Sequence, residues 1–253
     1  MSKMKIISFL FFTFLILLAA KAQEKTTISQ SYFSSGFKQT KESANFGLVF
    51  SGANIKYGHY WAKSENNRIF NIENEISVCI PFSKGIPALG IYLKPAEISY
   101  LFCASGKNTL AIGPLVKFEY NYTLYPQLQS AFDYWFSNFS LGISSTYNFS
   151  VANQPLSARL KFSLLGFTSR QPDYRNPYWY DIGFKHAIKH LNSDFEFSTL
   201  NKFNTIDFEL LWKPKPASRI SWSYCVNYSG YFDAPEISIV SHNIKLAFNP
   251  KNK

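Results

Sequence analysis

The segment 109–124, TLAIGPLVKFEYNYTL, alternates between two kinds of side chain along its whole length. Its even positions, from Leu110 to Leu124, carry no charge and no amide, whereas its odd positions include Lys117 and Glu119. Successive side chains of a β-strand point to opposite faces, so this period of two predicts a strand with one apolar and one polar face. A helix would scatter the same residues around its circumference. The segment is also longer than a usual strand of about five or six residues.

Similar alternating segments recur along the rest of the chain and are separated by polar, Gly- or Pro-containing connections. Strands are predicted at 28–37, 45–61, 68–80, 88–103, 109–124, 132–151, 156–168, 178–189, 194–200, 204–213, 219–229 and 237–248. Asn201–Phe203 is predicted to turn the chain between two of them. This interpretation gives about twelve strands, and ten is the alternative because strand boundaries taken from one sequence are imprecise.

The amino terminus has the pattern of an export signal. Lys3 and Lys5 precede an apolar run, and Ala20-Lys21-Ala22 precedes Gln23. The apolar run is shorter than the roughly 20 residues of a spanning helix, so residues 1–22 are predicted to be a cleaved signal peptide. Residues 23–253 are then a single β-barrel domain. The Ala-x-Ala pattern followed by Gln resembles exported and outer-membrane proteins of the Bacteroidota.

No later segment has the length and apolar character of a spanning helix, while the aromatic content of 18% is high. A membrane location would therefore require a closed barrel, since only closure leaves no backbone edge unpaired in lipid. The predicted fold class is all-β, a closed antiparallel up-and-down transmembrane β-barrel. A soluble secreted β-sandwich that acts as a binding protein is an alternative, because its strands also alternate.

Long, aromatic and nearly uncharged apolar rows favour the barrel over the sandwich. The last predicted strand ends in Leu246-Ala247-Phe248, which resembles the aromatic-terminated last strand of outer-membrane β-barrels of Gram-negative bacteria. The resemblance implies a place in the cell outer membrane, in contact with phospholipid and lipopolysaccharide. The net charge of +10 could suit nucleic acid. Export and the lack of a Lys/Arg run make nucleic acid an unlikely partner.

The polar rows carry acids and bases in near balance. The residues predicted to face the lumen as a charge network are Glu73, Glu75, Glu97, Lys117, Glu119, Arg159, Lys161, Asp181, Lys185, Asp207, Glu209 and Arg219, with Lys189 and Lys245 on the same faces. Such groups need partners inside a narrow barrel, away from bulk water. Glu73 and Glu75 could in principle serve acid/base catalysis. Ion pairing to neighbouring strands is the preferred interpretation.

A lipid-modifying hydrolase, of the phospholipase or lipid A deacylase type, is the alternative function. The chain has 4 histidines, of which His242 and His186 are weak candidates because they share faces with apolar residues and would point at lipid. Ser241 and Asn243 point to the opposite face from His242. A nucleophile would therefore have to come from an adjacent strand. A place among the interfacial aromatic residues is the preferred interpretation for both histidines.

The leading prediction is a non-enzymatic outer-membrane β-barrel, either a narrow solute channel or a structural or accessory component of the envelope. The 3 cysteines form no CxxC motif and no Cys/His cluster with metal spacing. No cofactor or metal is expected. A protein partner in the envelope is compatible with the sequence, but nothing in it specifies one.

Overall fold

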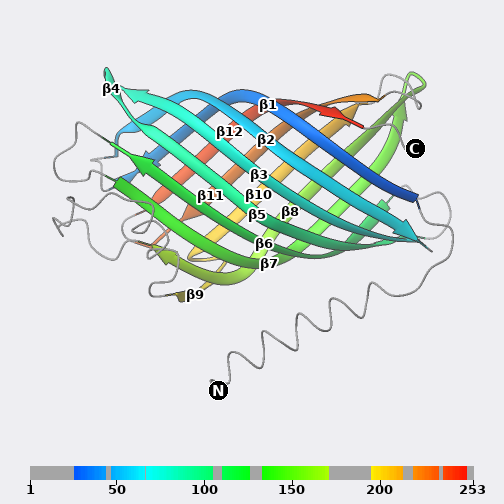
Figure 1. The fold of residues 1–253 in the computed structure, drawn as a ribbon. Coiled ribbons are helices and arrows are strands. Elements are labelled where there is room, and N and C mark those ends of the chain that lie inside the picture. Colours follow the sequence, from blue (N-terminus) through cyan, green and yellow to red (C-terminus); the bar gives the residue numbers. More distant parts are fainter. Residues whose placement is uncertain are drawn as a thin grey trace.

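A computed structural model describes residues 26–43, 47–65, 67–104, 110–125, 133–170, 195–212, 219–233 and 236–249. These residues form one antiparallel sheet that closes into a barrel (Figure 1). Within the described ranges, no helix has the length and apolar character needed to cross a membrane.

The strands are long and follow one another around the wall. They are β1 (Thr26–Glu42), β2 (Val49–Glu65), β3 (Arg68–Ser83), β4 (Ile86–Pro87), β5 (Leu89–Cys103), β6 (Leu110–Leu124), β7 (Asp133–Val151), β8 (Gln154–Arg170), β9 (Glu196–Thr199), β10 (Phe203–Trp212), β11 (Ile220–Tyr231) and β12 (Ile237–Phe248). The barrel has 10 strands and 2 extra ones, which are the short β4 and β9. The predicted class, a closed up-and-down β-barrel, is confirmed, and its wall has the strand number given as the alternative.

The first and last strands close the barrel. β1 pairs with β2 on one side and with β12 on the other, and its register places Ser31 opposite Phe248. The start of β1 and the end of β12 therefore lie at one end of the barrel, on the right in Figure 1, which we call the terminal end. The opposite end, where β1 leads into β2 and β11 into β12, is the distal end.

In the last third of the chain, one predicted turn is wrong, and one predicted strand lies outside the described residues. β9 and β10 both pair antiparallel with β8, at Leu165–Thr168 and at Leu156–Phe162. They therefore run in the same direction and form one interrupted strand, so the turn predicted at Asn201–Phe203 does not reverse the chain. The strand predicted at 178–189 lies outside the described residues.

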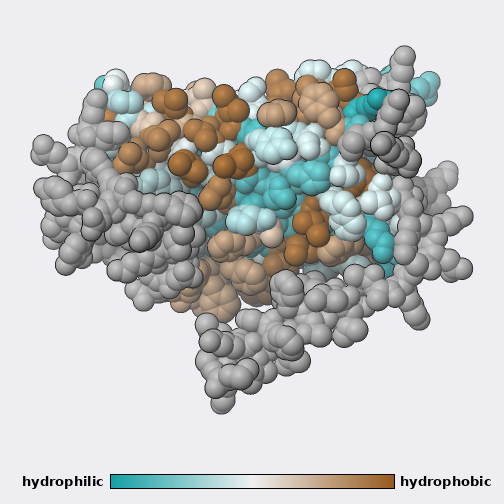
Figure 2. All heavy atoms as spheres, viewed as in Figure 1, coloured by the Kyte–Doolittle hydropathy of each residue, from teal (hydrophilic) through white to brown (hydrophobic). Residues whose placement is uncertain are grey.

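Side chains alternate between the two surfaces of the wall. On β3, Ile76, Val78 and Ile80 are exposed on the outside, while Glu73 and Ser77 are buried inside. Figure 2 shows hydrophobic residues over much of one outer face, with a hydrophilic area crossing it. An apolar exterior of this extent is unfavourable in water and fits lipid.

Pro95 interrupts the alternation on β5. The register with β6 shifts between Leu93 and Ala96, which marks a β-bulge. Proline cannot donate a ladder hydrogen bond, and a bulge is one of the few sheet positions that accepts it. Lys94 and Glu97 lie three residues apart, yet both are buried inside the barrel because of this extra residue.

Gly58 lets a tyrosine enter the lumen. It lies opposite Tyr32 in the β1–β2 register, and a Cβ added to it would lie 2.3 Å from the Tyr32 ring and 2.6 Å from the Asn74 carbonyl oxygen. A larger side chain would therefore displace the ring from the lumen.

We expect Gly58→Val to reduce the fraction of protein that refolds, because its side chain overlaps both a ring and the backbone. The measurement is the share of compact, heat-modifiable protein on SDS gels after refolding into detergent. Ala53→Val, on the lipid side of the same strand, is the control and should refold like the wild type. Equal refolding of the two variants would contradict this account of Gly58.

Candidate functional site

The middle of the lumen is filled by one polar network to which every wall strand contributes. Six carboxylates and six basic side chains form its ion pairs: Glu73, Glu75, Glu97, Glu119, Asp207 and Glu209 with Lys56, Lys94, Lys117, Arg159, Lys161 and Lys245. Hydrogen bonds from Tyr32 of β1, Asn138 of β7 and Asn227 of β11 join the remaining strands to it. The six carboxylates and six basic side chains are called the lumen network below.

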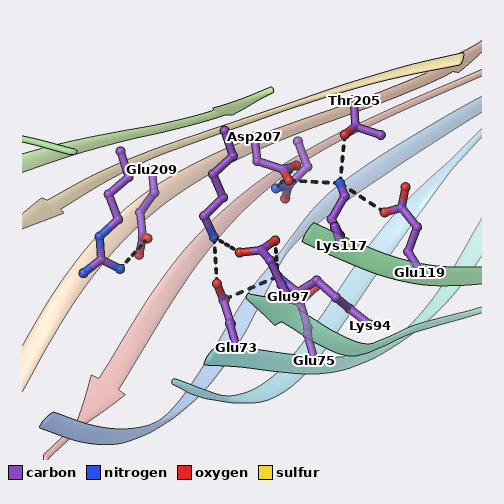
Figure 3. A network of polar contacts seen from close by, with 12 residues as sticks. Glu73, Glu75, Lys94, Glu97, Lys117, Glu119, Thr205, Asp207 and Glu209 are labelled. Carbon is purple, nitrogen blue, oxygen red and sulfur yellow. Dashed lines mark hydrogen bonds and ion pairs between the residues drawn. The ribbon is translucent and has the colours of Figure 1, made fainter. Parts of the chain in front are cut away.

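Glu73 is the centre of the lumen network. Its carboxylate lies 2.8 Å from Lys161 Nζ and 3.5 Å from Lys94 Nζ, and it accepts a 2.7 Å hydrogen bond from Tyr32. Lys161 also pairs with Glu97, and Lys94 lies 3.3 Å from the same carboxylate (Figure 3). The two carboxylates, which face each other on β3 and β5, are thus bridged by two lysines rather than left to repel one another.

Glu75, two residues along β3, is paired in its own right. Its carboxylate lies 3.2 Å from Lys56 Nζ and accepts a 3.0 Å hydrogen bond from Tyr32. Glu73 and Glu75 are therefore linked through one tyrosine hydroxyl and held by separate cations. Two carboxylates with cation partners favour the structural interpretation over acid/base catalysis.

Lys117 is the most buried cation of the lumen network, with 1% of its surface exposed. Its ammonium donates to Thr205 Oγ1 at 2.9 Å and lies 3.2 Å from Glu119 and 3.3 Å from Asp207. Asn227 donates to Asp207 at 2.9 Å, which ties this group to β11. Charges so far from bulk water need such complete pairing, because burying an unpaired charge is costly.

A second branch reaches toward the terminal end. Glu209 lies 3.3 Å from Arg159 and 3.0 Å from Lys245. The Arg159 guanidinium also stacks over the Tyr60 ring at 4.7 Å, and Lys245 lies 4.0 Å from the centre of the Tyr32 ring. Cation–π contacts add to the ion pairs and fix these long side chains across the lumen.

Most of the charges predicted from the sequence meet in this network. The structure brings together Glu73, Glu75, Glu97, Lys117, Glu119, Arg159, Lys161, Asp207, Glu209 and Lys245. Arg219 does not join them, because it precedes β11 and its side chain is exposed at the terminal end. Asp181, Lys185 and Lys189 lie outside the described residues.

Sequence reasoning missed two cations of the network, Lys56 and Lys94. Lys56 lies on β2, whose segment alternates imperfectly in sequence, although its even positions from Asn54 to Tyr60 all face inward. Lys94 was missed because the bulge at Pro95 moves it out of step with Glu97. A proline inside a long strand was the available signal for that shift.

Two small cavities adjoin the lumen network, with volumes of about 40 Å³ and about 50 Å³. Both are lined by Lys56, Glu75, Lys94, Asp207 and Asn227, so these five side chains stand between them. Charged and polar side chains of the network thus line both cavities.

At the distal end of the lumen, the described residues include a buried cluster of apolar and aromatic side chains. The cluster consists of Phe50, Ala88, Tyr125, Phe136, Phe203, Tyr231, Ile237 and Ile239. The rings of Phe50 and Tyr125 lie 4.7 Å apart, and Arg170 covers the Tyr231 ring at 4.2 Å. We call this cluster the distal plug. At the rim beyond it, the hydrogen bond and charge of Asp233 raise the pKa of Lys202.

His242 lies on the outer surface, as expected, but its partner is a tyrosine. Its Nδ1 lies 2.8 Å from the Tyr224 hydroxyl on β11, and the two rings stack. The Tyr224 hydroxyl thus gives Nδ1 of the imidazole a hydrogen-bond partner, and the interfacial position stays a prediction. His186, the second candidate, lies outside the described residues.

An apolar exterior, a closed wall and an ion-paired interior define the class: a transmembrane β-barrel of the outer membrane.

No protein-family model and no curated protein matches the sequence. Among solved structures, the outer-membrane protease OmpT from Escherichia coli aligns with a TM-score of 0.47 and 8% identity, over 91% of this chain and 99% of that chain. The β domain of the Bordetella autotransporter BrkA aligns with a TM-score of 0.44 and 10% identity, over 88% and 98%. The attachment invasion locus protein Ail of Yersinia pestis aligns with a TM-score of 0.35 and 12% identity, over 88% of this chain and 99% of that chain. The likeness concerns strand arrangement alone.

We expect Lys117→Met to lower the free energy of unfolding by about 3–5 kcal/mol, because it leaves Glu119 and Asp207 buried without their shared cation. The measurement is urea-induced unfolding in lipid vesicles, followed by tryptophan fluorescence. Lys202→Met, which removes an exposed lysine from the distal rim, is the matched control and should change stability little. A Lys117→Met protein as stable as the wild type would contradict the role given to this buried pair.

Proposed function

We propose that this protein is a non-conducting outer-membrane barrel with a structural or accessory role in the envelope. The observation that carries the proposal is the lumen network, which crosses the barrel and, with the hydrogen bonds of Tyr32, Asn138 and Asn227, joins all ten wall strands. Ions and solutes would have to displace paired charges to pass it, and each broken pair leaves an unpaired charge in a low-dielectric interior.

The distal plug supports the same proposal from a second position. Phe50, Phe136 and Phe203 lie buried inside the wall at the distal end, where their rings occupy part of the lumen. A narrow solute channel needs a continuous polar route that binds weakly enough to release its solute. The distal plug and the paired charges of the lumen network favour the structural role over that channel.

The outer surface determines the proposed surroundings. Its exposed apolar side chains would contact phospholipid on the terminal half and lipopolysaccharide on the distal half, if the termini face the periplasm as in other bacterial barrels. The lumen network would then give the wall rigidity, so that ends of fixed geometry are available to an envelope protein partner. The carboxylates of the network are proposed to be structural, not catalytic.

The test is conductance in planar lipid bilayers. We expect no conductance steps from protein whose folded state has been verified by heat-modifiable migration, because the lumen is filled. Regular steps from the wild-type protein would contradict the proposal and favour the narrow channel instead. A larger open barrel reconstituted in parallel verifies that insertion into the bilayer is detectable.

A further inference from the structure

A histidine on the lipid-facing surface is held between two serine hydroxyls. Ser29 and Ser31 of β1 alternate with the buried Gln30 and Tyr32, so they face outward, as does His59 of β2. Ser29 Oγ lies 3.1 Å from His59 Nε2, and Ser31 Oγ lies 3.3 Å from His59 Nδ1.

The two serines have different tasks, and the tautomer of His59 decides which serine has which. A neutral imidazole has one N–H donor and one acceptor nitrogen. If Nδ1–H donates to Ser31, then Nε2 accepts the proton of Ser29, and the Ser29 hydroxyl is paired with a general base. In an activated serine nucleophile, the hydroxyl is hydrogen-bonded to a general base, and a third group orients that base.

Polar side chains on a lipid-facing wall are expensive and commonly functional. This cluster is more polar than the site of His242 on β12, the other neighbour of β1, where the histidine has a tyrosine partner. Asn74 of β3 lies directly opposite His59 in the register and is exposed, so an amide adjoins the cluster.

The depth of Ser29 matches the ester region of a bilayer. With a tilt of roughly 40°, strand β1 of 17 residues spans about 42 Å, against an apolar band of about 25 Å. Each strand end then extends about 8 Å beyond the hydrocarbon. The first three residues of β1 rise by about this distance, so Ser29, the fourth residue, lies at the hydrocarbon boundary. Trp61, opposite Ser29 in the register, is a residue type typical of this boundary.

We propose that Ser29 and His59 form a hydrolytic site for the acyl esters of glycerophospholipids. Ser29 Oγ attacks the ester carbonyl carbon while His59 Nε2 takes its proton. The tetrahedral intermediate collapses, the ester C–O bond breaks, and the proton passes from His59 to the departing alcohol of the lysophospholipid. Water, deprotonated by His59, then cleaves the acyl-serine and releases a fatty acid. Ser31 is a positioning residue that fixes the imidazole tautomer.

The terminal end places this site in the leaflet that holds such lipids. With the termini in the periplasm, Ser29 faces the inner leaflet of the outer membrane, where glycerophospholipids lie. Arg68, exposed at the same end and bonded to the Tyr100 hydroxyl at 3.2 Å, brings positive charge to the headgroup level. The site lies outside the lumen, so it does not depend on whether the barrel conducts.

The experiment uses the full chain in phosphatidylethanolamine vesicles, with two measurements: covalent labelling by a fluorophosphonate probe, located by mass spectrometry, and fatty-acid release. We expect a probe adduct on Ser29. Ser29→Ala and His59→Ala should each reduce release by about 10²–10⁴-fold. Ser31→Ala should reduce it less and change its pH profile, and His242→Ala should release fatty acid at the wild-type rate.

Heat-modifiable migration verifies that each variant is folded before its activity is compared. Absence of both adduct and fatty-acid release from folded wild type would overturn the proposal, as would an adduct on another residue. Release that survives His59→Ala would equally overturn it. None of these results bears on conductance, so failure of this site is distinguishable from failure of the proposed closed barrel.

Discussion

Charge inside a lipid-embedded barrel has to be neutralised by charge, and this requirement organises the structure. The side chains that face the lumen have neither bulk water nor lipid headgroups to solvate them. The chain meets the requirement by matching six carboxylates with six cations across the wall. Seven strands then have to present their charges at matching heights, and the other three contribute Tyr32, Asn138 and Asn227, so the lumen network constrains the register of the wall.

Local irregularities serve this matching. The bulge at Pro95 turns Lys94 inward beside Glu97, where an uninterrupted strand would have sent one of them to the lipid. Gly58 leaves room for Tyr32, whose hydroxyl links Glu73 and Glu75. The bulge costs local regularity, whereas Gly58 leaves the register intact, and both features place a partner where a buried charge needs one.

The sequence predicts the wall well because alternation is a local property, as in 109–124. It predicts partners poorly, because which strand residues lie opposite one another depends on register. The bulge at Pro95 prevented the prediction of Lys94 as a lumen residue. The turn-like composition of Asn201–Phe203 prevented the prediction that β9 continues into β10. The contact of Ser29 with His59 crosses strands, on a segment whose outward face mixes serines with Phe33 and Phe37 and so gave no clear face.

The sidedness of the wall is the central claim, and spin-label accessibility on β6 tests it most directly. With the native cysteines replaced, labels at Ile112 and Val116 should collide readily with oxygen dissolved in lipid. Labels at Ala111 and Leu115 should not, although Leu115 is apolar, because both positions face the lumen. Equal oxygen accessibility at all four positions, or the reverse alternation, would contradict a barrel with its charges inside.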